Sequence, residues 1–154
     1  MEAIERDKVV KIAKSWLGTP YHHMARVKGV GVDCLTLLAE VFHEAGLVPT
    51  VPVEFYPKDW MHHRDNERYL EGLLKYTREI EPDPRPGDIV LWKIGRCFSH
   101  GAIVVQWPIV IHACAGLHVM LEDISKSQSL NFIGENTTDR GKPRLKKYFS
   151  YWGR

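Results

Sequence analysis

The fold class is indicated most clearly by three short runs, Ile89-Val90-Leu91-Trp92, Ala102-Ile103-Val104-Val105 and Ile109-Val110-Ile111. Each run is rich in β-branched residues and is bounded by glycine, proline or glutamine, which is typical of neighbouring antiparallel strands. Two further segments, His118 to Leu121 and Arg144 to Trp152, extend the predicted sheet. The C-terminal half is therefore expected to form an antiparallel β-sheet.

Helical patterns come earlier along the chain. Apolar residues recur at helical spacing from Ile4 to Leu17 and again from Leu37 to Ala45, each time before a glycine. A third helix is predicted over 70–77, after a proline-containing, extended connection from Val48 to Trp60. Because helices precede strands without alternation, we expect an α+β domain in which N-terminal helices pack on a C-terminal antiparallel sheet.

Length and charge exclude several classes of protein. The 154 residues fit one domain, 1–154, and no apolar run approaches the roughly 20 residues of a membrane-spanning helix. The charged segment Met1 to Asp7 lacks the apolar core of a secretory signal, so we expect synthesis in the cytoplasm and no membrane insertion. The net charge of +2 is too small to indicate nucleic-acid binding. The basic residues from Arg140 to Lys147 are interpreted as a solvated strand face, with contact to an anionic polymer as the alternative.

The three cysteines, Cys34, Cys97 and Cys114, are odd in number and contain no CxxC pair, which argues against a disulfide framework. Cys34 lies at a predicted helix start, with Asp33 as the N-cap. Amides and the helix dipole there favour a thiolate and can hold an oxyanion, so Cys34 is predicted to be a nucleophile with a lowered pKa. The alternative is a buried, inert cysteine. Cys97 and Cys114 are interpreted as structural.

A cysteine nucleophile needs a base, and that base needs a partner to fix its tautomer. Among eight histidines, a hairpin centred on residue 106 places His100 opposite His112, or diagonal to it after a one-step shift. Such neighbours have Cβ atoms about 4.5 to 8 Å apart, so one imidazole can orient the other. Metal binding or core packing is the alternative for this pair. No zinc site is expected, because the cysteines do not supply three or four ligands at suitable spacing.

Five motifs follow one another along most of the chain. They are Gly18-Thr19-Pro20-Tyr21, Gly31-Val32-Asp33-Cys34, Pro86-Gly87-Asp88-Ile89-Val90, Ser99-His100-Gly101-Ala102-Ile103 and Ile111-His112-Ala113. This ordered set resembles the NlpC family of cell-wall endopeptidases, which are papain-like cysteine peptidases. Tyr21-His22-His23 and the segment Tyr56 to Trp60 are similar to the branch of that family encoded in phage and prophage tail regions.

The resemblance implies a papain-like fold and a role for each matching residue. In the family the cysteine attacks, a histidine on a strand is its base, and a polar residue on the next strand orients that histidine. These roles fall on Cys34, His100 and His112. Tyr21 matches a family tyrosine that sits over the cysteine, and Asp33 matches the acid beside it.

Substrate contacts are also expected from the resemblance, at Tyr21, Asp33, Thr36 and Ser99. Many family members have Ser-Gly after the cysteine, whereas this chain has Leu35-Thr36, a departure that touches the cleft wall and substrate choice. The implied reaction is hydrolysis of an amide bond in peptidoglycan stem peptides, between D-glutamate and diaminopimelate, without a cofactor.

The expected partners are a peptidoglycan peptide and phage tail proteins, and the expected place of action is the cell wall, as part of a phage tail. Two other readings stay open at this point. In the first, the chain is a structural piece of a phage tail tip with little or no catalysis. In the second, it is a Cys-His amidase or acyltransferase that acts on another substrate.

Overall fold

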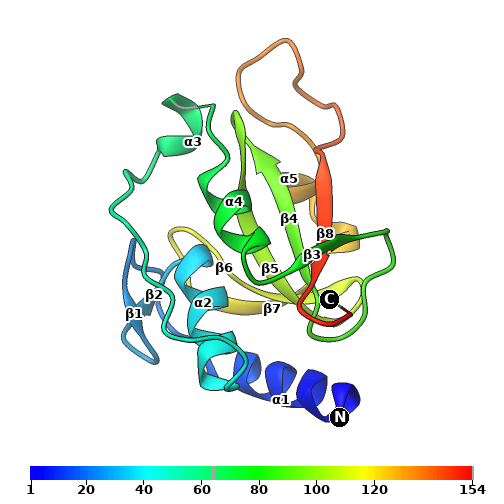
Figure 1. The fold of residues 1–154 in the computed structure, drawn as a ribbon. Helices are drawn as coiled ribbons and strands as arrows, with labels where there is room; N and C mark the ends of the chain where they lie inside the picture. The colour runs from blue at the N-terminus through cyan, green and yellow to red at the C-terminus, as the bar shows by residue number, and fades with distance from the viewer. Residues whose placement is uncertain (64, 154) are drawn as a thin grey trace.

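A six-stranded antiparallel sheet forms the centre of the structure, a computed structural model that describes residues 1–63 and 65–153 (Figure 1). In spatial order its strands are β3 (Arg78–Ile80), β8 (Lys146–Ser150), β4 (Ile89–Ile94), β5 (Cys97–Gln106), β6 (Ile109–Ala113) and β7 (Val119–Asp123). Neighbouring strands run antiparallel throughout this sheet. The three β-branched runs of the sequence lie in β4, β5 and β6, so the predicted sheet is confirmed.

Three short strands have no counterpart in the sequence prediction. β1 (Arg26–Val27) and β2 (Gly31–Val32) form a separate antiparallel hairpin, and β3 pairs with β8 at the edge of the main sheet. Segments of two or three residues are too short to display the alternation by which strands are recognised. Their pairing partners, rather than their own composition, make them strands.

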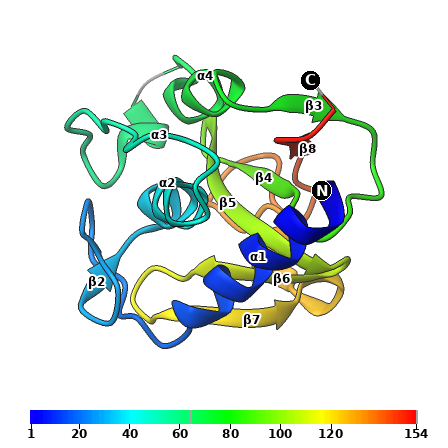
Figure 2. The same ribbon diagram turned by 60° about the horizontal axis from the view of Figure 1, so that its bottom comes forward.

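The helices occupy both faces of the sheet. They are α1 (Glu2–Ser15), α2 (Cys34–Glu44), α3 (Trp60–His63), α4 (Arg68–Leu74) and α5 (Gln128–Asn131), with a 3-10 turn η1 (Ile124–Lys126) before α5. The first four all contact β5, and Figure 2 shows α1 crossing in front of β6 and β7. The predicted α+β arrangement is confirmed. Among the described residues, none of the helices is both long enough and apolar enough to cross a bilayer.

Alternation along β4 and β5 divides the core into two layers. Leu91 and Ile103 pack in the larger cluster with Leu37 of α2. Trp92 and Val104 point the other way, into a smaller cluster that Ile124 of η1 and Leu130 of α5 complete. Each fully buried side chain of this size stabilises the fold by about 1.5–3 kcal/mol. The sheet is therefore covered on both faces, and its residues are held in a fixed register.

A buried ion pair attaches α1 to the start of β4. Arg6 Nη1 donates to Asp88 Oδ1 and to the carbonyl oxygen of Pro86, both at 2.8 Å. The Arg6 guanidinium also stacks over Trp152, 4.2 Å from the ring centroid. Both members of the pair are buried, so each charge depends on the other for compensation. The Pro86-Gly87-Asp88 motif has a structural role here.

The basic residues near the C-terminus have acidic partners within the chain. Arg144 Nη1 lies 2.9 Å from Glu135 Oε1, and Lys142 Nζ lies 2.9 Å from Asp139 Oδ1. Lys147 Nζ lies 3.4 Å from a carboxylate oxygen of β3. The basic residues fit the predicted solvated strand face only in part, because Arg140, Lys142 and Arg144 lie before β8 and the Arg144 side chain is only 8% exposed.

Candidate active site

Cys34 is the first residue of α2, directly after the N-cap residue Asp33. Asp33 Oδ1 accepts hydrogen bonds from the backbone amides of Leu35 at 3.0 Å and Thr36 at 2.9 Å. Thr36 Oγ1 in turn accepts from the Asp33 amide at 2.9 Å, which completes a capping box. The predicted N-cap is confirmed, and it fixes the position from which the thiol leaves the helix.

The Cys34 sulfur lies against the main chain of β5. It donates to the carbonyl oxygen of Ser99 at 3.5 Å, and the amide of Gly101 faces it. The packing of α2 and α4 on this part of β5 requires glycine at position 101, because a Cβ there would collide with Tyr69 Oη and would lie 2.9 Å from a Leu38 methyl carbon. The residues on either side of His100 thus hold the thiol through their backbone atoms.

The pKa of Cys34 is raised to about 12, chiefly by burial and secondly by the negative charge of Asp33. The amides of Gly101, Cys34 and Leu35 lower the pKa, but by less. The sequence-based expectation of a lowered thiol pKa at the helix start is therefore wrong for this state. A helix terminus favours the thiolate, whereas removal of water disfavours it more strongly.

His100 and His112 are in direct contact. His100 Nε2 lies 2.9 Å from His112 Nδ1, and His112 Nε2 lies 2.7 Å from Glu122 Oε1. The register pairs Ile103 with Ile111, so His112 lies diagonal to His100, which is the shifted form of the predicted hairpin. The predicted contact between the two histidines is confirmed.

The hydrogen bonds of this chain fix both tautomers. The Glu122 carboxylate can only accept, so His112 carries its proton on Nε2 and presents a bare Nδ1. That nitrogen accepts from His100 Nε2–H, which leaves His100 Nδ1 as a free acceptor. Burial, and then His112, lower the pKa of His100 to about 3. Burial also lowers the pKa of His112, although Glu122 opposes the shift. Both rings are therefore neutral at pH 7.

The thiol and the His100 ring meet the same strand from different sides. Adjacent residues of a strand point to opposite faces, and Gly101 faces α2 and α4. The His100 ring lies beside Trp92 instead, with ring centroids 5.7 Å apart. No hydrogen bond joins Cys34 Sγ to His100 in the described part of the chain. The structure brings the thiol to the strand of the histidine but not into contact with the imidazole, and the role of His100 as base stays a prediction.

A small cavity of about 40 Å³ adjoins Cys34 and is lined in part by Tyr21, Asp33 and Ser99, three of the residues predicted to contact substrate. Burial, then Cys34 and Asp33, raise the pKa of Tyr21, so its phenol is a hydrogen-bond donor at neutral pH. Tyr56 also lines the cavity and donates its hydroxyl to Asp33 Oδ2. These contacts define the immediate surroundings of the thiol.

The hydroxyls of Thr36 and Ser99 are engaged inside the protein. Both residues are buried. Thr36 Oγ1 donates to the carbonyl oxygen of Ala25 at 2.7 Å, and Ser99 Oγ donates to that of Ile94 at 3.0 Å. In this state both hydroxyls support the fold around Cys34. Their contact with substrate stays a prediction.

A larger cavity of about 520 Å³ lies next to the small one, between α2, the 48–57 connection and α4. The two cavities share Leu35, Tyr56, Trp60 and Tyr69 as lining residues. Most of the other lining side chains are apolar, with Glu54, Arg68, Glu71 and Lys75 as charged exceptions. A chain-like substrate that reaches Cys34 has space to extend into this region.

Glu122 and His23 are site residues that the sequence analysis misses. Glu122 can be recognised as a site residue only from the pairing of β6 with β7. This pairing aligns Glu122 with Val110, two residues from His112. His23 lines the Cys34 cavity, and its Nε2 lies 2.6 Å from the Tyr56 carbonyl oxygen. A strand prediction extended by two residues would have placed Glu122 on the correct strand. The Tyr21-His22-His23 motif places His23 close to the predicted site, but nothing in it distinguishes His23 from His22 as the ring that lines the cavity.

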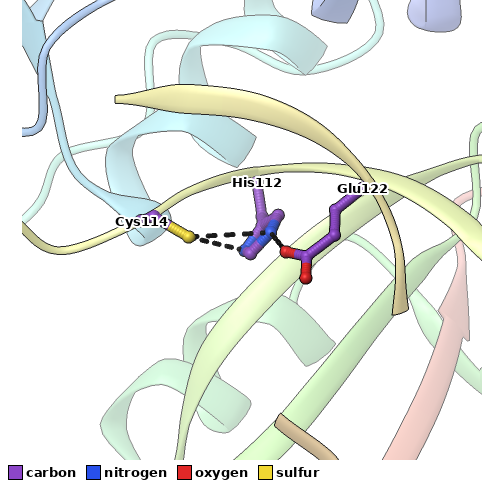
Figure 3. Close-up of side chains that lie close together, drawn as sticks. All are labelled: His112, Cys114 and Glu122. Atoms are coloured by element: carbon purple, nitrogen blue, oxygen red, sulfur yellow. Dashed lines mark hydrogen bonds and ion pairs between the residues drawn. The ribbon is translucent and has the colours of Figure 1, made fainter. Parts of the chain in front are cut away.

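One group of side chains has the composition of a metal site. His112, Cys114 and Glu122 place their ligand atoms within 4.8 Å of one another. Figure 3 shows the three side chains together. This cluster differs from the sequence-based expectation, which considered the cysteines without a carboxylate from the neighbouring strand.

Solved structures of NlpC/P60 domains are similar to this fold. The NlpC/p60 domain of the peptidoglycan hydrolase SagA has a TM-score of 0.52 and 18% identity, over 78% of this chain and 90% of that one. NlpC1 and NlpC2 from Trichomonas vaginalis have TM-scores of 0.58 and 0.60 at 19% and 16% identity, over 80% and 97% of this chain. This chain spans 41% and 47% of those two proteins, less than half of each.

No protein-family model matches the sequence, and no curated protein is significantly similar to it. At identities below 20%, the likeness to the solved structures concerns the fold. The observed N-terminal helices and six-stranded antiparallel sheet agree with the fold expected from the motifs. The superpositions agree with the same fold. The chain has an NlpC/P60-like papain fold.

Proposed function

We propose that this chain is a cysteine peptidase that hydrolyses an amide bond in peptidoglycan. The observation that carries the proposal is the joint position of two groups on one NlpC/P60-like fold. Cys34 starts α2 against β5, and the hydrogen-bonded series His100, His112 and Glu122 begins on that same strand. SagA, whose NlpC/p60 domain has this fold, is a peptidoglycan hydrolase.

The tautomers dictate the direction of proton transfer. His100 Nδ1 is the acceptor in the proposed reaction. Because the ring lies on the other side of β5 from the thiol, the reaction first requires a rearrangement of this strand that brings Nδ1 to Cys34, which then gives up its proton to that nitrogen. The sulfur then bonds to the substrate carbonyl carbon, and the C–N bond breaks as His100 returns the proton to the leaving amine. Water, deprotonated by the same nitrogen, cleaves the thioester and releases the acid.

Backbone amides at the start of α2 would hold the oxyanion. The amide of Cys34 already acts on the sulfur, because it lowers the pKa of the thiol, whereas the amide of Leu35 also donates to Asp33 Oδ1 and would have to be shared. An oxygen bonded to the carbon under attack would develop its charge close to the same donors, where oriented dipoles in a water-poor site are most effective. The thiol and the imidazole are neutral in the resting state, so the proposed proton transfer creates both charges, and the backbone dipoles at the helix start must compensate the negative one.

The proposal is tested with purified sacculi from Gram-negative and Gram-positive cells. Wild-type protein is expected to release soluble muropeptides, and Cys34→Ala is expected to release none. Cys97→Ala is the matched control, since Cys97 is a buried cysteine of β5 that is not among the residues lining the Cys34 cavity. Equal release by wild type and Cys34→Ala would contradict the proposal.

The bond between D-glutamate and diaminopimelate is the proposed cleavage point, and the family resemblance of the motifs supports it. Action at the cell wall within a phage tail is likewise proposed from Tyr21-His22-His23 and the segment Tyr56 to Trp60. Mass analysis of the released fragments distinguishes this bond from the other stem-peptide amides. Co-purification with tail particles from an induced lysogen addresses the assembly.

A second candidate function follows from the larger cavity. Its mainly apolar lining beside Cys34 fits an acyl chain better than a polar stem peptide, and this favours an amidase or acyltransferase on an apolar substrate. Turnover of p-nitrophenyl esters of increasing chain length separates the two functions. Rates that rise steeply with chain length, without muropeptide release, would favour the second candidate.

A further inference from the structure

We propose that His112, Cys114 and Glu122 form a zinc-binding site that reversibly switches off the histidine pair. Cys114 Sγ lies 3.7 Å from both ring nitrogens of His112, and Glu122 Oε1 lies 2.7 Å from His112 Nε2. Figure 3 shows the thiol and the carboxylate approaching the imidazole from two sides. Binding of the ion does not depend on the proposed peptidase function, whereas its regulatory effect does.

The three donors suit zinc in both chemistry and spacing. Zinc accepts imidazole nitrogen, thiolate sulfur and carboxylate oxygen at about 2.0 to 2.3 Å, so tetrahedral neighbours lie about 3.3 to 3.8 Å apart. The thiol of Cys114 lies 3.7 Å from Nε2 but equally far from Nδ1, so its side chain must turn toward Nε2 to share an ion with it. Glu122 has to withdraw by about half an ångström to reach that spacing. It is able to do so because 32% of its side chain is exposed.

The backbone holds the donors in place before any ion arrives. His112 lies on β6 and Glu122 on β7, which are paired along their whole length. Cys114 follows β6 directly, where its amide donates to the carbonyl oxygen of His118 at 3.2 Å and closes the turn into β7. Little ordering of the chain is therefore required for binding. Cys114 and Glu122 are partly exposed, which leaves a route for the ion and a fourth position for water.

Zinc at His112 Nε2 reverses the hydrogen bond between the histidines. Cys114 releases its proton to solvent and binds as thiolate. The neutral His112 ring then carries its proton on Nδ1, because Nε2 is bound to the ion. The Nδ1–H group of His112 then donates a hydrogen bond to His100 Nε2. His100 must therefore carry its own proton on Nδ1. That is the atom on which the proposed mechanism requires a lone pair, and the peptidase is inhibited.

Binding is measured by titrating the full chain with zinc in competition with a chromophoric chelator. We expect one equivalent to bind, and we expect Cys114→Ser and Glu122→Gln each to weaken binding by at least about tenfold. The double variant His62→Gln/His63→Gln is the control for surface histidines, and Cys34→Ala is the control for the other half-buried thiol. Both controls should bind as wild type does.

Nitrogen-15 spectra of the imidazole groups give a readout that is independent of activity. Zinc is expected to move the His100 proton from Nε2 to Nδ1 in Cys34→Ala as well as in wild type. Undiminished zinc binding in both Cys114→Ser and Glu122→Gln would overturn the site. A titration in which wild-type protein does not bind about one zinc ion per chain would also overturn it. An unchanged His100 tautomer in the zinc-bound protein would overturn the switch. If zinc binds and shifts the tautomer while no variant hydrolyses peptidoglycan, the site stands and only the proposed function fails.

Discussion

Glu122→Ala removes the acceptor that orients both histidines. His112 Nε2 then loses its 2.7 Å partner, and its neutral ring is free to carry the proton on Nδ1 instead. A hydrogen bond to a charged group contributes about 1.5–3 kcal/mol. Since 32% of the Glu122 side chain is exposed, solvent screening places this bond at the lower end, about 1.5–2 kcal/mol. At 1.36 kcal/mol per factor of ten, kcat should fall by about tenfold to thirtyfold.

The assay is steady-state hydrolysis of a purified muropeptide, with kcat and KM determined separately. Glu122 acts through His112 rather than on substrate, so kcat should fall while KM stays within about twofold. Glu81→Ala, a change of an exposed glutamate in the loop after β3, is the control and should behave as wild type. Nitrogen-15 spectra should show loss of the Nε2–H tautomer at His100. A Glu122→Ala enzyme with wild-type kcat, in a preparation where Cys34→Ala is inactive, would refute the relay.

Three further predictions follow from single contacts. Arg6→Met should lower the free energy of unfolding by about 3–5 kcal/mol in urea denaturation, because Asp88 is left buried without a counter-charge, and a loss below 1 kcal/mol would count against this. Alkylation of Cys34 by iodoacetamide should accelerate about tenfold per pH unit from pH 6 to 9, because the thiolate fraction rises at that rate below a pKa of about 12. The alkylation rate is measured by peptide mass spectrometry. A plateau of the rate near neutral pH would contradict this expectation. Gly101→Ala should destabilise the fold by about 1–3 kcal/mol through overpacking, whereas Gly72→Ala, which has open space in α4, should stabilise it by about 0.5–1 kcal/mol.

Local patterns are sufficient to predict the main elements. The β-branched runs at 89–92, 102–105 and 109–111 carry their own strand propensity, and α1 and α2 have apolar faces that match the helical period. Asp33 is recognisable as an N-cap from its place before an apolar helix. The contact between His100 and His112 follows from a short turn. Each of these features depends on residues close together in sequence.

The thiol pKa depends on distant segments and is not predictable from the helix start alone. Tyr69 of α4 donates to the carbonyl oxygen of Cys34 at 2.9 Å, and β5 lies against the sulfur. These segments are 35 and 65 residues away along the chain. The sequence indicates the amides that favour a thiolate, but only the assembled fold reveals how many atoms of other segments surround the half-buried thiol.

The orientation of His100 has a similar origin. Its strand carries a register shift beside Trp92 and Lys93, and such an irregularity changes which residues near it share a face. Glu122 joins the site because β7 pairs with β6 in one particular register. Sequence patterns predict which segments are strands, whereas register is decided by turns and packing across the whole sheet.

The most direct measurement is capture of the acyl-enzyme. Protein mixed with muropeptide is quenched in acid after milliseconds to seconds, digested, and analysed by mass spectrometry for a peptide that carries a substrate fragment. We expect a thioester on Cys34 in the wild type and in Cys114→Ser, and no adduct in Cys34→Ala. An adduct on Cys114, or hydrolysis of the muropeptide by Cys34→Ala at the wild-type rate, would contradict this prediction.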